Sequence, residues 1–279
     1  MRNKLLTLLA LVITSYSSLS GQMHEELPII HLKDSQRVEG KAYYSFVWQR
    51  DSNSHEQDDH EIMILKFSKE TSEFSSYSYY TNDSAARINR ERSWNEPGFT
   101  YQSKYIEGIR EKYYTQKDNT YEIRSFGEIF YLIPDKETVQ WTIEDSVKQL
   151  QGYIAQKATA SSHGRNYTVW FTSDLPYSFG PRRLHGLPGL ILEAYDNKGQ
   201  IRYSLNKIDL QPTLEYIGIP VKSQKATLNQ FLNMADAWKR NYKNGSIKID
   251  GKEFEVNNFS TSRPVKVAKS KYNNPIDLQ

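Results

Sequence analysis

Residues 166–196 of the chain read NYTVWFTSDLPYSFGPRRLHGLPGLILEAYD. The stretch contains two short runs of β-branched and aromatic residues, 167–172 and 190–195, which are typical of β-strands. Between the runs, glycine and proline gather at 180–189. Because proline fixes φ and glycine adopts backbone conformations that other residues avoid, we expect this loop to be rigid and irregular. We predict that it turns the chain over the edge of a sheet and places Leu187 in the core.

Similar strand-like runs continue along most of the chain. They share an enrichment in β-branched and aromatic residues, and they lie at 42–50, 61–67, 73–80, 112–116, 121–126, 129–133, 139–144, 152–158 and 201–210. His163-Gly164 and Asn197-Lys198-Gly199 each place turn-forming residues between two such runs, as antiparallel hairpins require. The sequence therefore predicts a mainly β protein with a largely antiparallel sheet.

One late segment has a helical period instead. From Leu228 to Tyr242 the apolar residues recur at steps of three and four, which places them on one stripe of a helix. Thr227 and Gln230 are three residues apart and match the capping box that begins many helices. We therefore expect an α+β fold in which a curved antiparallel sheet or half-barrel packs on this C-terminal amphipathic helix.

The N-terminus has the three-part layout of a secretory signal peptide. Arg2 and Lys4 are positive, residues 5–13 are apolar, and small and polar residues follow. The apolar run is shorter than the ~20 residues that span a bilayer, and no later segment is long and apolar enough to do so. We expect residues 1–21 to be cleaved and residues 22–279 to form a single β-rich domain with a polar C-terminal tail, located in the periplasm or secreted.

Composition argues against several kinds of function. The chain has no cysteine, which excludes disulfides, thiolate metal sites and lipid attachment to an N-terminal cysteine. Loss of Arg2 and Lys4 with the signal peptide leaves 36 − 2 = 34 basic residues against 33 acidic ones, a balance that does not favour binding to nucleic acid. The sequence also lacks a glycine-rich phosphate loop, a G-x-S-x-G elbow and an H-E-x-x-H helix, so no cofactor is expected.

The sequence HEQDDHE, from His55 to Glu61, is the strongest candidate for a metal site. His55, Asp58 and His60, with the neighbouring carboxylates, could hold a divalent cation. The alternative is a solvated acidic hairpin loop between strands that end near Arg50 and begin at Glu61. We favour the loop, because metal sites usually draw ligands from several rigid elements.

A hydrolase-type enzyme is a further alternative. Asp174 and His185 could share a proton as acid and base, with Arg183 close by in the sequence. Nothing in the sequence fixes the distance between the two side chains. A single histidine in a loop is more often simply a polar residue.

The string Gly186-Leu187-Pro188-Gly189-Leu190-Ile191 resembles the signature of the GLPGLI family, exported proteins of Bacteroidota whose activity is not established. Other elements similar to the family's are ILKFSKETSEF at 64–74, the GY and KA pairs at 152–158, the strand at 167–172, Gly180-Pro181 and the closing NPIDL at 274–278. Relatives often carry a cysteine where this chain has Ile154-Ala155, so a thiol function there cannot apply. The resemblance implies a half-barrel similar to that of periplasmic lipoprotein carriers and an association with outer-membrane transport receptors.

Together these features predict a non-enzymatic periplasmic binding or accessory protein of the cell envelope. It would bind an apolar or peptide-like ligand, or dock to an outer-membrane transport partner. The candidate residues are those of the rigid loop, which would line the rim of a pocket or a docking surface: Arg182, Arg183, His185, Gly186, Leu187, Pro188 and Gly189.

Overall fold

The computed structural model describes residues 32–81, 111–126, 129–243, 246–249, 252–255 and 273–278. The predicted signal peptide lies outside the described residues. Within them, no helix has the length and apolar character needed to cross a membrane. Compact packing is found over residues 31–279, so the unit that contains the sheet is described here by itself.

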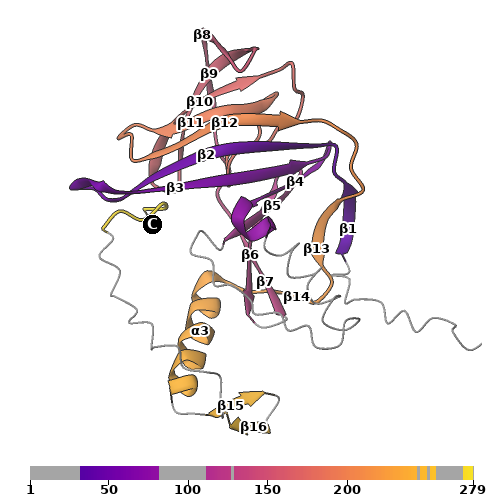
Figure 1. The fold of residues 1–279 in the computed structure, drawn as a ribbon, viewed down its shortest axis with the longest axis vertical. Coiled ribbons are helices and arrows are strands. Elements are labelled where there is room, and N and C mark those ends of the chain that lie inside the picture. The colour runs from indigo at the N-terminus through magenta and orange to yellow at the C-terminus, as the bar shows by residue number, and fades with distance from the viewer. Residues whose placement is uncertain are drawn as a thin grey trace, which may run out of the picture. The chain divides into compact units, whose positions relative to one another are not determined.

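The described chain is dominated by β-strands (Figure 1). In chain order they are β1 (Leu32–Arg37), β2 (Gly40–Asp51), β3 (Ser54–Phe67), β4 (Thr71–Ser76), β5 (Lys112–Gln116), β6 (Asn119–Phe126), β7 (Ile129–Pro134), β8 (Thr142–Leu150), β9 (Tyr153–Ser162), β10 (Arg165–Thr172), β11 (Leu190–Asp196), β12 (Ile201–Asp209), β13 (Tyr216–Pro220), β14 (Ser223–Lys225), β15 (Ser246–Ile249) and β16 (Lys252–Glu255). One helix, α3 (Leu228–Lys243), follows β14.

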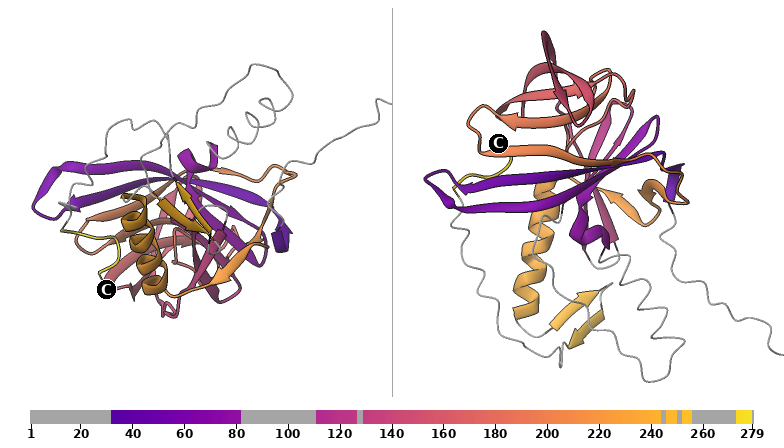
Figure 2. Two further views of the ribbon diagram at one scale, coloured as in Figure 1. Left: turned by 90° about the horizontal axis from the view of Figure 1, so that it is seen from below. Right: turned by 45° about the horizontal axis from the view of Figure 1, so that its top comes forward.

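Twelve strands form one sheet in the order β14-β7-β6-β5-β4-β3-β2-β12-β11-β10-β9-β8. The sheet is open, with β14 at one end and β8 at the other, and every pair is antiparallel except β14 with β7. Separate two-stranded pairings join β1 to β13 and β15 to β16. The strand direction turns from one end of the large sheet to the other, as the right-handed twist of strands requires (Figure 2). The predicted mainly β, antiparallel-rich fold is confirmed.

The local predictions agree with the strands in most places. Every predicted strand run overlaps an observed strand, and the turns at 163–164 and 197–199 join β9 to β10 and β11 to β12. The run at 73–80 is the main difference, because the chain turns helical at residue 77. The hydroxyl of Ser76 accepts a hydrogen bond from the backbone N–H of Tyr79 (3.3 Å), which is how a serine begins a helix.

The main core lies on one face of the large sheet. Alternate residues of the strands bury aromatic and aliphatic side chains there, such as Tyr44, Phe46 and Val169. The loop between β10 and β11 packs into the same cluster with Leu175, Phe179, Leu184 and Leu187. The sheet therefore buries its apolar face largely against a loop of its own chain.

Helix α3 is confirmed, including its start. The Thr227 hydroxyl accepts from the backbone N–H of Gln230 (3.2 Å), and the Gln230 side chain accepts from the backbone N–H of Thr227 (2.8 Å), as a capping box requires. Phe231 is buried in an edge contact with the Tyr131 ring of β7, at 5.6 Å between ring centres. Leu228 and Leu232 are 39% and 42% exposed, so the first turn contacts the sheet through Phe231. Wider coverage of the sheet by the helix stays a prediction.

Candidate functional site

The glycine- and proline-rich loop is built to hold one conformation. Gly186 has a φ of 94°, a value that side-chain-bearing residues rarely adopt. A Cβ atom on Gly189 would lie 2.0 Å from the backbone oxygen of Thr172, so only glycine permits this close approach of the loop to β10. Leu187 is 1% exposed and belongs to the main core. The predicted rigid loop with Leu187 in the core is confirmed.

The two arginines of the loop point toward β5 and the C-terminal segment rather than toward solvent. Arg182 donates from Nη2 to the Tyr113 hydroxyl (2.6 Å) and to Asp277 Oδ2 (3.0 Å). Arg183 lies over the same tyrosine ring, with its guanidinium carbon 4.7 Å from the ring centre. The side chains of Arg182 and Arg183 are 11% and 12% exposed. These cations are therefore buried in contacts with the protein itself.

Arg183 is surrounded by three carboxylates. Its Nη1 contacts Asp277 Oδ2 at 2.6 Å, its Nη2 contacts Glu122 Oε2 at 2.9 Å, and its Nε lies 3.0 Å from Asp135 Oδ2. The pairs join the loop to β6, to the segment after β7 and to the C-terminal segment. A buried charge is tolerated when it is paired in this way.

The electrostatic environment keeps the acidic partners ionised. Burial would raise the pKa of Asp277, but the charges of Arg182 and Arg183 outweigh burial and lower it. Burial opposes the same shift at Asp135, whose pKa is lowered by its hydrogen bonds with His163 and the backbone N–H of Glu137 and by the nearby charges. The site is thus an internally neutralised ion-pair network.

A small cavity of about 10 Å³ adjoins this network. It is lined by both loop arginines, Asp277 and the side chains of Tyr167 and Tyr203, among others. The Tyr203 hydroxyl is buried and has no partner among the described atoms. The cavity has room for about one water molecule, whereas small-molecule pockets usually measure about 300–1,000 Å³. An aromatic-lined ligand pocket at the rim of the loop was expected, and this cavity is far too small to be one.

His185 and Asp174 occupy different environments. The backbone carbonyl of His185 accepts a hydrogen bond from Trp141 Nε1 (2.8 Å), and burial lowers the pKa of the imidazole. The nearby charges acting on His185 are those of Asp118 and Asp135. Asp174 is exposed, and its backbone N–H donates to the Thr172 hydroxyl (3.3 Å). Among the contacts found in the described residues, none joins Asp174 to His185.

The sequence HEQDDHE lies in a strand, so the expectation of an acidic hairpin loop from 51 to 60 is wrong. Strand β3 begins at Ser54, and Asp58 and His60 stand opposite Gln49 and Val47 of β2. The hairpin turn is confined to residues 52–53, because the polar residues continue the pairing with β2. No group of three or more potential ligands is found among the described residues, and the side chain of His55 lies outside them.

Comparison with known proteins finds a short match to one family. Residues 162–193 match a family described as "Protein of unknown function (Porph_ging)". The match is consistent with a family of Bacteroidota type, and it covers β10, the loop and the start of β11. No curated protein matches the sequence significantly.

Solved structures show only distant similarity. Two structures of PNGF-II, in space groups P21 and C2, align with 76% and 75% of this chain, each at 13% identity and a TM-score of 0.49. The chain spans about a third of their length, 34% and 33% respectively. An uncharacterized conserved protein from Thermus thermophilus aligns with 67% of this chain and 91% of its own length, at 8% identity and a TM-score of 0.33.

Proposed function

We propose that the chain is an exported, non-enzymatic accessory protein of the bacterial cell envelope that belongs to the GLPGLI family and docks to a partner protein. The docking surface is the β8–β9 patch, defined as Ile143, Val147 and Ile154. In this proposal the open sheet is a half-barrel whose interior is filled by its own loop. The partner contacts the rim at β8, and an outer-membrane transport protein is the first candidate.

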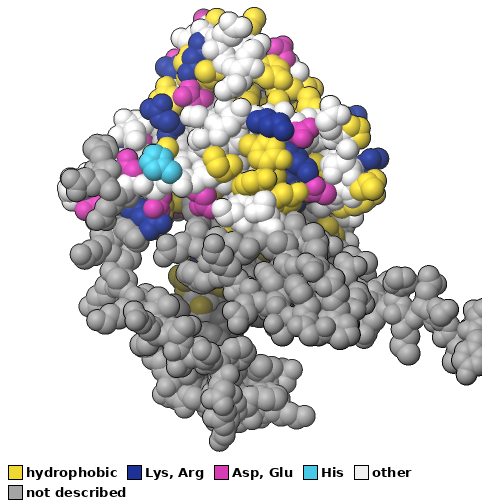
Figure 3. All heavy atoms as spheres, in the orientation of Figure 1, with side chains coloured by type: hydrophobic (Ala, Val, Ile, Leu, Met, Phe, Trp, Pro, Cys, Tyr) yellow, Lys and Arg dark blue, Asp and Glu magenta, His cyan; other side chains and the backbone are white. Residues whose placement is uncertain are grey.

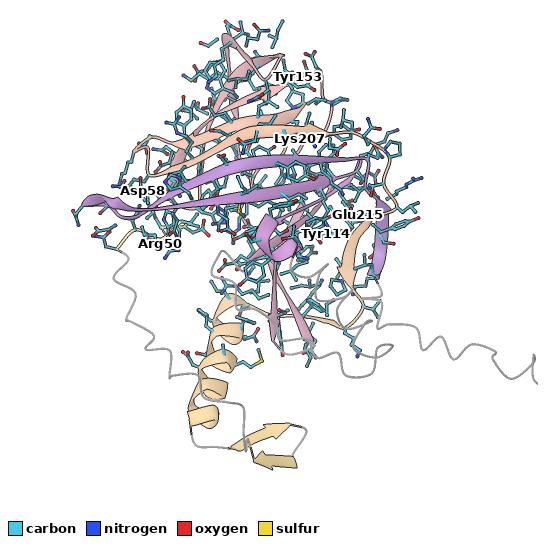
Figure 4. The ribbon with its side chains drawn as sticks, viewed as in Figure 1. Arg50, Asp58, Tyr114, Tyr153, Lys207 and Glu215 are labelled. Atoms are coloured by element: carbon cyan, nitrogen blue, oxygen red, sulfur yellow. The ribbon has the colours of Figure 1, made fainter. Side chains whose placement is uncertain are left out.

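The exposure of the β8–β9 patch is the observation that carries the proposal. Ile143, Val147 and Ile154 are 46%, 62% and 69% exposed. Ile143 stands opposite Ala158, and Val147 stands opposite Gln156. Because Ile154, Gln156 and Ala158 alternate along β9, all three apolar side chains share one face of the sheet. Hydrophobic side chains are also visible at the upper end of the molecule, where β8 and β9 lie (Figure 3). Tyr153, at the start of β9, marks the same end (Figure 4).

The backbone of β8 suits the same use. Among the described strands β8 pairs only with β9, so its other side offers free backbone donors and acceptors. Edge strands are often protected by charged side chains, but Lys148 is paired with Glu193 and Glu144 with Lys157. An extended segment of a partner can add to such an edge through backbone hydrogen bonds while its apolar side chains cover the patch.

The loop favours docking over carriage of a small apolar ligand. Arg182 and Arg183 are already neutralised by carboxylates, and the adjoining cavity holds about one water. The loop residues therefore support the sheet, and the partner is read elsewhere.

The test is affinity capture of the tagged chain from envelope extracts, with surface variants compared side by side. The double variant Val147→Lys/Ile154→Lys places two charges on the patch at highly exposed positions, so the fold should be unaffected. Leu214→Lys is the matched control, because Leu214 is 87% exposed and lies between β12 and β13. We expect one partner to be recovered with the wild type and the control and to be lost with the double variant. Equal recovery with all three proteins, or no specific partner for the wild type, would contradict the proposal.

A further inference from the structure

The C-terminal segment, residues 273–278, is held by side chains from distant parts of the chain. It forms neither a helix nor a strand and lies beside the end of the β2–β3 hairpin (Figure 1). Arg165 of β10 donates from Nε to the backbone oxygen of Ile276 (2.7 Å) and from Nη2 to that of Pro275 (2.6 Å). The segment is thus recognised along its backbone by a buried arginine whose side chain is 1% exposed.

Asn274 is bound on three sides and is 3% exposed. Its side-chain Nδ2 donates to the backbone oxygen of Gln49 (2.6 Å), and its Oδ1 accepts from Arg165 Nη2 (2.7 Å). Its backbone oxygen accepts from Trp48 Nε1 (2.9 Å), and its backbone N–H donates to the oxygen of Arg50 (3.2 Å). An asparagine is the residue whose side chain both donates and accepts at this position.

The rest of the segment is also recognised. Ile276 packs against the main core, and the Asp277 carboxylate receives both loop arginines. The backbone N–H of Leu278 donates to the oxygen of His163 (3.1 Å). Proline suits position 275, because its carbonyl accepts from Arg165 and no hydrogen-bond donor is required of its nitrogen.

The groups that hold the segment are fixed by partners of their own. Arg165 Nη1 contacts Asp196 Oδ2 (2.7 Å) and Gln200 Oε1 (3.2 Å), and the Asp196 side chain is fully buried. Arg183 is held by Glu122 and Asp135 independently of Asp277. Binding groups that are ordered before the ligand arrives lose less entropy when it binds.

We propose that this groove is a peptide-recognition site for segments of the type Asn-Pro-Ile-Asp. It is filled here in cis by the chain's own residues 274–277. The same segment of a second copy of the chain can take its place, which links two copies tail to groove. The recognition chemistry is an asparagine amide, three successive backbone carbonyls at 274–276, an aliphatic side chain and a carboxylate.

Covalent attachment gives the chain's own segment an advantage over a free peptide. A tether of ordinary length supplies an effective concentration of about a millimolar, so a free peptide binds the intact chain weakly. The intact chain must therefore be compared with one whose own segment is weakened.

The experiment uses the full chain carrying Asn274→Ala/Asp277→Ala and a fluorescent peptide with the wild-type sequence of residues 273–279. Binding is followed by fluorescence anisotropy. We expect saturable binding at least about tenfold tighter than to the wild-type chain, whose own segment competes. A peptide carrying the same two alanines should bind neither protein, and Arg165→Met in the weakened chain should abolish binding.

Two outcomes would overturn this inference. One is a folded double variant that shows no saturable binding, and the other is equal binding of the wild-type and alanine peptides. Near-UV circular dichroism establishes the folded state. If the double variant is unfolded, the wild-type peptide is added during refolding: restored ellipticity supports the inference, and failure of the peptide to restore it contradicts the inference.

Discussion

Replacement of Arg165 by methionine should destabilise the protein more than most single substitutions. Arg165 donates hydrogen bonds to Asp196, Gln200, Asn274, Pro275 and Ile276. Methionine preserves much of the apolar volume but removes the charge. The Asp196 carboxylate, fully buried, then loses its cationic partner.

The expected loss follows from what remains around Asp196. Breaking a buried ion pair costs about 3–5 kcal/mol, because the remaining charge is uncompensated. Asp196 Oδ1 still accepts from the backbone N–H groups of Gln200 (2.7 Å) and Ile201 (3.0 Å), so part of the charge stays solvated. We therefore expect a decrease of about 3–4 kcal/mol in the free energy of unfolding.

Urea denaturation of the wild type and of Arg165→Met measures this difference. With a slope of about 2–3 kcal/mol per molar, the midpoint should fall by about 1–2 M. The double variant Arg165→Met/Asp196→Asn removes the stranded charge and should recover at least about 1 kcal/mol relative to Arg165→Met. A midpoint within about 0.2 M of the wild type, or a double variant no more stable than the single one, would refute the reasoning.

Three further predictions concern the loop and its ion pairs. Gly189→Ala forces a Cβ against the Thr172 carbonyl and should lower the free energy of unfolding by about 1–3 kcal/mol or more, measured by urea denaturation. Leu187→Ala leaves a cavity in the core and should cost about 2–5 kcal/mol, seen as a lower melting temperature; no change would mean that Leu187 is not a core residue. The lowered pKa of Asp277 adds stability that is present above the unfolded pKa of about 4 and is lost as pH falls through the folded value, so Asp277→Asn should flatten the decrease in stability between about pH 5 and pH 3. An unchanged pH profile in that variant would exclude Asp277 as a source of the acid sensitivity.

The strands could be predicted because their pattern is local. On β10, Tyr167, Val169 and Phe171 are buried, while Thr168 and Trp170 alternate with them on the other face. Burial on one face imposes this period of two, so the sequence shows it directly. Order in the sheet is a different matter: Val147 looks like a core residue in the sequence and is 62% exposed, since β8 lies at the end of the sheet.

The candidate site was harder to predict because its partners are far apart in the chain. The glycines and prolines of the loop indicate a rigid backbone from local chemistry alone. Asp277, in contrast, lies 94 residues after Arg183, and Glu122 lies 61 residues before it. Only the fold brings these charges together. The paired occurrence of two loop arginines and an acidic residue in the closing NPIDL was the available signal.

The misplaced hairpin loop has a similar explanation. Residues 55–61 are so polar that they were assigned to a loop. Pairing with β2, a strand that extends to Asp51, keeps them in β3, and Asp59 forms an ion pair with Arg50. Polarity indicates exposure to water, but an exposed strand at the end of a long hairpin is as polar as a loop.

Photo-crosslinking in living cells tests the central claim, docking at the β8–β9 patch, most directly. A benzophenone-bearing amino acid replaces Val147 in one protein and Leu214 in the control, both at exposed positions. After irradiation, the account predicts one discrete adduct with an envelope protein from position 147 and none from position 214. The same adducts from both positions, or none from position 147, would contradict docking at this edge of the sheet.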